Sequence, residues 1–217
     1  MQVHHALSAD LAAGAAAAAA TSLRQAARAD VYAVIGALLL TPPDDALLQL
    51  LRSAEPPLRD PDLMLAWQRL VQAALETTAP AAAAEHAALF VAVGTPALDP
   101  RASVYRGSIA LAALREDLRA LGLERSAAAA WSEDHLGALC EVLRLLIEAQ
   151  RPQRLQGAFF RRHVAPWYAA CLADLRRVDG VPLHAAVAGV VQAFFDLEAV
   201  ELGDDNDDND DNDSGGA

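Results

Sequence analysis

Apolar residues in this chain recur at three- and four-residue spacing between proline breaks, a pattern that leaves few fold classes open. Residues 21–40 show it clearly, because one helical face there carries Leu23, Ala27, Val31, Val34, Ile35, Leu38 and Leu39. No segment alternates between apolar and polar residues for long enough to predict a strand. The sequence therefore predicts an all-α fold, a single-domain bundle of roughly eight or nine helices around one core.

Prolines and capping residues predict where the helices begin and end. Proline pairs at 42–43 and 56–57 end helices, because proline cannot continue the hydrogen-bond ladder. Asp60 followed by Pro61 is an N-cap with proline at the first helical position. Pro166 lies inside a predicted helix and indicates a kink or a break there. The expected helices span about residues 21–40, 44–51, 60–75, 80–93, 108–121, 131–150, 153–178 and 183–202.

The 217 residues are enough for one domain with a substantial core, and we expect three parts. Residues 1–20 are predicted to be a flexible alanine-rich lead-in, residues 21–202 the all-α domain, and residues 203–217 a disordered acidic tail. The net charge is −12, and the tail supplies seven of the negative charges (Asp204, Asp205, Asp207, Asp208, Asp210, Asp211 and Asp213). The domain is therefore only mildly acidic and has no basic stripe, so we expect no nucleic-acid partner.

The chain is expected to be cytoplasmic. Residues 12–20 are apolar, but no Arg or Lys precedes them and Asp10 interrupts the approach, so the charged start of a secretory signal is missing. No run reaches the ~20 strongly apolar residues that span a bilayer, so no stable membrane insertion is expected. Cys140 and Cys171 both lie in apolar helical patterns, which favours buried free thiols of a reduced compartment.

Residues 85–107 (EHAALFVAVGTPALDPRASVYRG) are the least helix-like stretch of the domain. A helix end with Leu89 and Phe90 leads into a loop of about a dozen residues, and loops of that length in compact domains are usually functional or disordered. The loop residues that stand out are Gly94, Pro96, Pro100, Ser103, Val104 and Tyr105. We interpret the segment as a structured functional loop; core packing of the Leu89-Phe90 pair is the alternative.

Residues 131–141 form a second unusual stretch. Ser132 is a natural N-cap, and Glu133 and Asp134 suit the first turn of a helix, where the dipole favours anions. The apolar stripe of this predicted helix is Leu136, Leu139, Cys140, Leu143, Leu146 and Ile147. The opposite face carries Asp134, Gly137, Ala138 and Glu141, with His135 at the boundary.

That face of small residues between two carboxylates would let another peptide lie close to the helix, with acids for its basic groups. We expect His135 to be charged more readily beside the acids, and to tie the loop to the helix. An ordinary capped helix with a solvated back is the alternative.

Enzyme activity is not expected. His135 beside Asp134 or Glu133 has the residue types of an acid–base pair, but neighbours in one turn do not orient each other across a cleft. The sequence has no glycine-rich phosphate loop and no Cys or His pair at zinc spacing. Ser103 and Ser132 lack the setting of an activated nucleophile. We therefore predict no catalytic residue and no metal site.

The order and spacing of several motifs resemble the TorD/DmsD family of chaperones, to which the NarJ type is more distantly related. The segments that carry the resemblance are ALFVAVGTPALDPRASVYRG, then SEDHLGALCEVL, then FFRRHVAPWYAACLADL, over about residues 85–170. Two departures are Ala102, where an acidic residue is often found, and the acidic tail.

The resemblance implies a cytoplasmic binding protein, not an enzyme. Its expected partner is the apo catalytic subunit of a molybdenum oxidoreductase, bound through its twin-arginine signal peptide, its body or both. The client would then receive molybdopterin guanine dinucleotide before export or assembly, whereas the chaperone itself would bind no cofactor stably. The chaperone would be a monomer or a homodimer. The expected partner-binding residues are Leu89, Phe90, Pro96, Pro100, Ser103, Tyr105, Glu133, Asp134, His135 and Glu141.

In this interpretation a groove with Leu89, Phe90 and Tyr105 holds the apolar part of the peptide, and the acids hold its guanidinium groups. The alternative is an all-α peptide-binding or regulatory module with an unrelated protein partner. A tight pocket around His135 would favour an enzyme, whereas a wide apolar groove bordered by acids would favour the chaperone.

Overall fold

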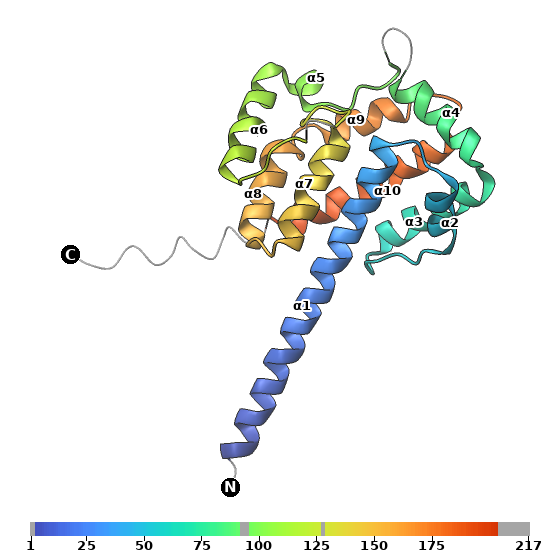
Figure 1. Cartoon of the computed structure of the whole chain (residues 1–217). Helices are drawn as coiled ribbons and strands as arrows, with labels where there is room; N and C mark the ends of the chain where they lie inside the picture. The colour runs from blue at the N-terminus through green and yellow to red at the C-terminus, as the bar shows by residue number, and fades with distance from the viewer. Residues whose placement is uncertain (1–2, 92–95, 127–128, 204–217) are drawn as a thin grey trace.

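The computed structural model describes residues 3–91, 96–126 and 129–203, and these form helices joined by short connections (Figure 1). The helices are α1 (Val3–Leu40), α2 (Asp45–Ser53), α3 (Pro61–Glu76), α4 (Ala79–Phe90), α5 (Ala102–Arg106), α6 (Ser108–Ala120), α7 (Leu136–Glu148), α8 (Gln153–His163), α9 (Tyr168–Leu175) and α10 (Pro182–Glu201). Within the described residues the only β pairing is one isolated bridge between Arg101 and His135. The all-α prediction is confirmed.

Two features raise the helix number above the predicted eight or nine. Residues 102–106, expected to be the end of a loop, form the short helix α5. The helix predicted over residues 153–178 is divided into α8 and α9, and Pro166 lies in the turn between them. The break expected at this proline is thus confirmed.

Aspartate caps account for two of the helix starts. The carboxylate of Asp44 accepts a hydrogen bond from the Leu47 amide (2.8 Å), and that of Asp60 accepts one from the Leu63 amide (2.9 Å). Such caps satisfy amide groups that have no partner inside the helix.

The first helix begins at Val3 and not near Thr21. Residues 3–20, expected to be a flexible lead-in, are therefore helical, which agrees with the high helix propensity of alanine. Figure 1 shows that this half of α1 extends away from the other helices. The acidic tail from Asp204 onward lies outside the described residues.

Helix α10 lies at the centre of the core and packs against α1, α3, α4, α8 and α9. Its buried side chains include Val187, Val191, Phe194 and Phe195. It is long and apolar enough to cross a bilayer by length and composition alone, although no such span was expected from the sequence. Half of the stretch is buried in the protein, and a core helix of a soluble protein meets the same criterion.

Helices α1 and α7 pack closely because two glycines face the contact. A Cβ atom on Gly137 would lie 2.7 Å from Cγ of Leu40, and one on Gly36 would lie 2.7 Å from Oε1 of Glu141. A side chain at Gly137 would collide with Leu39 and Leu40 of α1, whereas at Gly36 the end of the Glu141 side chain would have to move. The end of α1 is thereby held against the beginning of α7.

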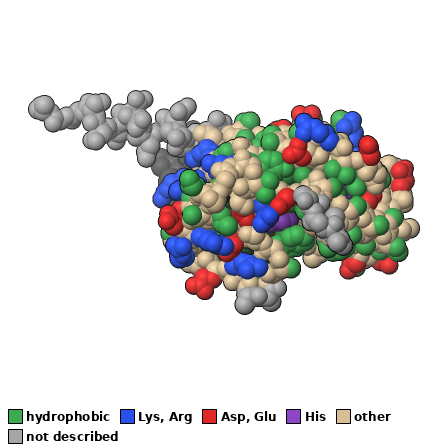
Figure 2. Space-filling view, turned by 90° about the horizontal axis from the view of Figure 1, so that it is seen from above, with side chains coloured by type: hydrophobic (Ala, Val, Ile, Leu, Met, Phe, Trp, Pro, Cys, Tyr) green, Lys and Arg blue, Asp and Glu red, His purple; other side chains and the backbone are tan. Residues whose placement is uncertain are grey.

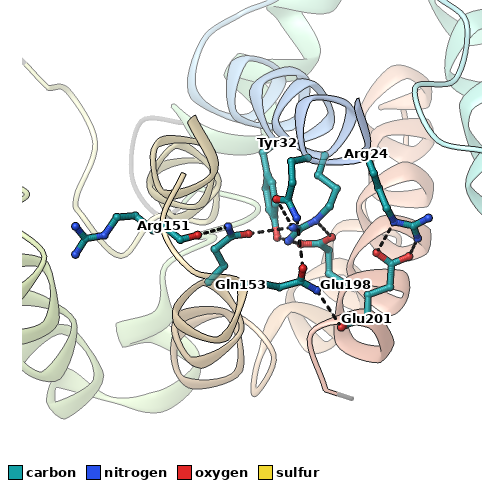
Figure 3. Close-up of polar contacts among 9 residues, drawn as sticks. Arg24, Tyr32, Arg151, Gln153, Glu198 and Glu201 are labelled. Carbon is teal, nitrogen blue, oxygen red and sulfur yellow. Dashed lines mark hydrogen bonds and ion pairs between the residues drawn. The ribbon is translucent and has the colours of Figure 1, made fainter. Parts of the chain in front are cut away.

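A buried ion pair joins α1 to α10 (Figure 3). The Arg28 guanidinium donates to both carboxylate oxygens of Glu198, at 2.6 and 2.7 Å, and both side chains are almost completely buried. The Tyr32 hydroxyl donates to Glu198 (2.7 Å), and Gln156 of α8 accepts from Arg28 (2.9 Å). The amide of Gln156 in turn donates to the Arg151 carbonyl (2.9 Å). The network therefore fixes α1, α8 and α10 to one another.

We predict that Glu198→Gln destabilises the protein by about 3–5 kcal/mol, because it leaves the buried Arg28 charge without its counter-ion. The matched control is Glu201→Gln, which breaks the more exposed ion pair between Arg24 and Glu201 on the same two helices. That change is expected to cost less than about 1 kcal/mol. Urea unfolding measures both, and equal losses for the two variants would contradict the prediction.

Candidate functional site

The loop before α5 is joined to the segment before α7 by backbone hydrogen bonds. The Ala102 amide donates to the Asp134 carbonyl (2.9 Å), and the Leu136 amide donates to the Pro100 carbonyl (2.8 Å). These bonds flank the Arg101–His135 bridge. The two stretches that stood out in the sequence thus meet, as expected, although backbone groups make the link.

Asp134 is completely buried, and its carboxylate accepts a hydrogen bond from the Ser103 amide (2.8 Å). It therefore caps α5 from another part of the chain. Burial alone would raise the pKa of Asp134, but hydrogen bonds from Ser103 and Ser132 outweigh it and hold the pKa below its usual value. Asp134 was expected to be available to the basic groups of a partner, but its side chain is completely buried and one of its oxygens accepts from the loop.

His135 is the N-cap of α7, which begins at Leu136 and not near Ser132 as predicted. Its Nδ1 accepts a hydrogen bond from the Gly137 amide (3.1 Å), so the proton of the neutral ring is on Nε2. Nε2 is buried and has no hydrogen-bond partner among the described residues. His135 thus carries an unused N–H donor.

Burial lowers the pKa of His135 to about 4, although Asp99 and Asp134 act in the opposite direction. The expectation that the neighbouring acids make His135 easier to charge is therefore wrong. Desolvation has the larger effect, and the ring is neutral at pH 7.

A hollow of about 230 Å³ lies at the meeting point of the two stretches. Its lining residues are Phe90, Pro96, Leu98, Asp99, Pro100, Arg101, Ala130, Trp131, Ser132 and His135. At its rim Arg101 donates two hydrogen bonds to Asp99, one of them at 2.6 Å. Figure 2, which views the molecule from the top of Figure 1, shows hydrophobic side chains interspersed with arginines and carboxylates on this face.

The structure brings four of the ten predicted site residues together in the hollow: Phe90, Pro96, Pro100 and His135. Leu89 is completely buried in the core. Tyr105 stacks on Trp167 (ring centroids 5.4 Å apart) and donates to Asp174 (3.0 Å). The predicted groove of Leu89, Phe90 and Tyr105 is therefore not formed, because each of these side chains packs against different neighbours.

The small-residue face of α7 is only partly free for a peptide, because Ala138 is partly exposed but Gly137 is buried. Gly137 lies against Leu39 and Leu40, so the first helix of the chain itself covers that position. Glu133 is paired with Arg115 (3.2 Å) and Glu141 with Arg144 (2.8 Å), and both carboxylates remain partly exposed. Hydrogen bonds from Arg115 lower the pKa of Glu133 although its partial burial acts in the opposite direction.

Comparison with known families decides which kind of protein has this arrangement. A model described as the nitrate reductase delta subunit matches residues 57–173, more than half of the chain. The chain belongs to the nitrate reductase delta subunit family. No curated protein matches it.

Members of this family are TorD-like cytoplasmic chaperones for the maturation of molybdoenzymes, so the resemblance drawn from residues 85–170 is confirmed. The matched region contains all ten predicted site residues. It also contains the hollow and the backbone hydrogen bonds that join the loop before α5 to the segment before α7.

Three buried histidines surround Phe90 in this delta-subunit family member. The ring centroids of His86, His135 and His184 lie 4.8, 6.3 and 5.8 Å from that of Phe90. His86 and His184 were not predicted as site residues. His86 precedes Phe90 by one helical turn, so helical spacing could have indicated it, whereas His184 comes from α10, and only the tertiary fold brings it near.

An apolar groove of about 430 Å³ adjoins the hollow, and Ala130, Trp131 and Ser132 line both. Its largest apolar side chains are Leu40, Leu118, Leu123, Trp131, Val142 and Leu145. Glu124, Glu133 and Glu141 also line it. Sequence reasoning missed its apolar residues because they come from α1, α6, α7 and the connection between the last two. No three His, Cys, Asp or Glu side chains in the described ranges are placed to hold a metal ion.

We predict that Asp134→Ala costs about 1–3 kcal/mol, because the partly buried Ser103 amide loses its acceptor. Amide exchange at Ser103, followed by NMR, should become faster. Asp134→Asn keeps an oxygen at this position and is expected to lose less stability. An Ala variant with wild-type stability and unchanged exchange would contradict the capping role.

Stability is expected to fall between pH 7 and pH 5. Burial, together with the nearby His184, lowers the pKa of His86 to about 4, and burial lowers that of His135 to about 4 as well. Because the unfolded chain binds these protons near pH 6.5, the stabilisation is complete above 6.5 and is lost as the pH falls towards 4. Each histidine contributes a slope of at most about 1.4 kcal/mol per pH unit.

Urea unfolding at pH 7.5, 6.0 and 5.0 measures this slope. His86→Gln removes one titrating group and should flatten it. A wild-type stability that does not change over this range would show that the histidines are not held neutral.

Proposed function

We propose that this chain binds the apo form of the catalytic subunit of a molybdenum oxidoreductase and holds it until molybdopterin guanine dinucleotide is inserted. The observation that carries the proposal is the family match over residues 57–173, since this family consists of molybdoenzyme maturation chaperones. The cofactor would enter the client and not this chain. The cytoplasm, where the family acts, is the proposed location.

The hollow suits an extended peptide segment of the client. His135 offers a buried N–H donor without a partner, and a backbone carbonyl is the most abundant acceptor that a peptide supplies. Phe90, Trp131 and Pro96 provide apolar contact around it. We propose that the segment is the twin-arginine signal peptide or another terminal part of the client.

Arginine side chains of the client would pair with Asp99 and Glu133, and not with Asp134 as predicted. The Asp134 carboxylate already caps α5 and is completely buried. Asp99 and Glu133 are paired with Arg101 and Arg115, whose side chains are 44% and 50% exposed. Exposed ion pairs contribute little free energy, so a client arginine can exchange with them.

The geometry around His135 gives no support to acid–base catalysis. Nδ1 is bonded to an amide within α7, Asp134 is bonded to Ser103, and the ring pKa is about 4. A general base that works near neutral pH needs a pKa closer to 7. We therefore propose a binding role without catalysis.

The proposal is tested by purifying the tagged chain from cells that express molybdenum oxidoreductases and identifying bound proteins by mass spectrometry. We predict recovery of one catalytic subunit in its apo form. His135→Asn is the test variant, because asparagine retains the helix cap but lacks the ring Nε2–H. Loss of one hydrogen bond to the client should weaken binding about tenfold.

His163→Asn is the matched control, since His163 is also buried but bonds to Asp117 at another part of the surface (2.6 Å). It should leave client recovery unchanged. If the wild-type chain recovers no such subunit where one is expressed, the proposed function is wrong. Wild-type recovery with equal binding by His135→Asn would keep the function and exclude the hollow.

A further inference from the structure

Two stretches of this sequence carry opposite charges that are not mixed with the other sign. Residues 149–173 contain four arginines and no Asp or Glu, although the whole chain has a net charge of −12. Residues 204–213 contain seven aspartates and no Arg or Lys. Unlike charges gathered in this way attract each other wherever the fold brings them close.

The basic stretch includes α8, and helical spacing places two of its arginines on one face. Arg154, Ala158 and Arg161 follow one another at four- and three-residue spacing, and all three are exposed. These residues form the cationic face of α8. No basic stripe was expected from the sequence, because the acidic net charge of the domain conceals this local excess of arginine.

The arginines of the cationic face have few partners. Arg154 makes no side-chain hydrogen bond or ion pair within the described part of the chain. Arg161 uses one of its N–H groups to donate to the Leu202 carbonyl. Arg162, beside the face, pairs with Asp117 (3.1 Å). Arg154 and most of the Arg161 guanidinium are therefore available to carboxylates through charge-assisted hydrogen bonds.

The path of the chain leads the acidic stretch to this face. Helix α10 ends at Glu201, and the Leu202 carbonyl that accepts from Arg161 follows directly. The same carbonyl oxygen lies 2.9 Å from where a Cβ atom on Gly157 would be, so the end of α10 rests against α8. The aspartates thus begin two residues after a group that already contacts the cationic face.

The acidic stretch is long enough to follow the whole of α8. The 11 residues of α8 rise about 16 Å, whereas ten extended residues span up to about 33 Å. Each exposed ion pair contributes only about 0.2–1 kcal/mol. A short tether, however, holds the aspartates at an effective concentration in the millimolar range, so a few weak pairs suffice for binding.

We propose that residues 204–213 bind to the cationic face of α8 within the same molecule. Their aspartates pair with Arg154 and Arg161 and shield these arginines from other anions, because a separate acidic partner has to compete with a tethered one. No residue of the cationic face lines the hollow proposed to hold the client. The inference therefore does not depend on the proposed function.

Paramagnetic NMR on the full chain tests this contact. Ser214→Cys accepts a nitroxide label selectively, because Cys140 and Cys171 are buried. We expect the label to broaden the Ala158 amide signal at about 20 mM NaCl and to have a much smaller effect at about 1 M, where charges are screened beyond about 3 Å. Replacing the seven aspartates with asparagine keeps the tether length and should reduce the broadening at least about threefold.

Arg154→Glu is the test variant on α8, since glutamate is favourable in the first turn of a helix and Arg154 is exposed. Its matched control is Arg69→Glu on α3, an exposed arginine whose replacement changes the net charge equally. Loss of one exposed pair changes the ratio of bound to free segment about threefold. The test variant should therefore weaken the broadening by at least this factor, and the control should leave it unchanged.

Equal broadening with the aspartate and asparagine segments would overturn the proposal, because tethering alone would then explain the proximity. Equal effects of Arg154→Glu and Arg69→Glu would overturn it as well. A mixture of isotope-enriched unlabelled chain with nitroxide-labelled chain of natural isotope content tests for a second copy as the partner. Broadening at Ala158 in that mixture as strong as in the single labelled chain would contradict binding within one molecule.

Discussion

The buried ion pair between Arg28 and Glu198 sets the positions of the long helices on which the site depends. Two charges removed from water cost several kcal/mol each, so they are tolerated only where hydrogen bonds satisfy them. Tyr32 and Gln156 meet that need here, and they do so in one register of α1 against α8 and α10. That register brings the end of α1 to α7, where the Leu40 carbonyl holds the Trp131 indole. A polar network on one side of the bundle thus helps to fix the candidate binding surface at the end of the same helix.

The sequence was sufficient for most helix boundaries because they depend on local chemistry. Aspartate caps, proline breaks and apolar spacing act within a few residues, and Asp60 and Pro166 act as predicted. The start of α1 was missed because the apolar stripe that marks a packed helix begins only near Leu23. Alanine continues the helix on propensity alone and leaves no amphipathic signal.

The two stretches that meet at the candidate site stood out in the sequence, but their contacts were not predicted. Helical periodicity separates strongly apolar residues from the rest, but it does not say whether Gly137 and Ala138 face water or another helix. The same limit applies to Asp134, which was predicted to lie in the first turn of a helix capped by Ser132. In the structure it caps α5, and His135 takes the local position. Tertiary packing therefore decides which acid caps which helix.

The acids of the candidate site differ in burial. The difference distinguishes an acid that holds the fold from acids that can bind a partner. Asp134 is completely buried, so replacing its hydrogen-bond donor with a client arginine would require α5 to open. Glu133 and Glu141 are partly exposed and paired with exposed or half-buried arginines, so exchange there costs little. A chaperone must release its client after cofactor insertion, and weak exchangeable ion pairs beside an apolar groove permit that release. A buried charge pair such as Arg28–Glu198 would be too costly to break and remake, which explains why it lies in the core and not at the binding surface.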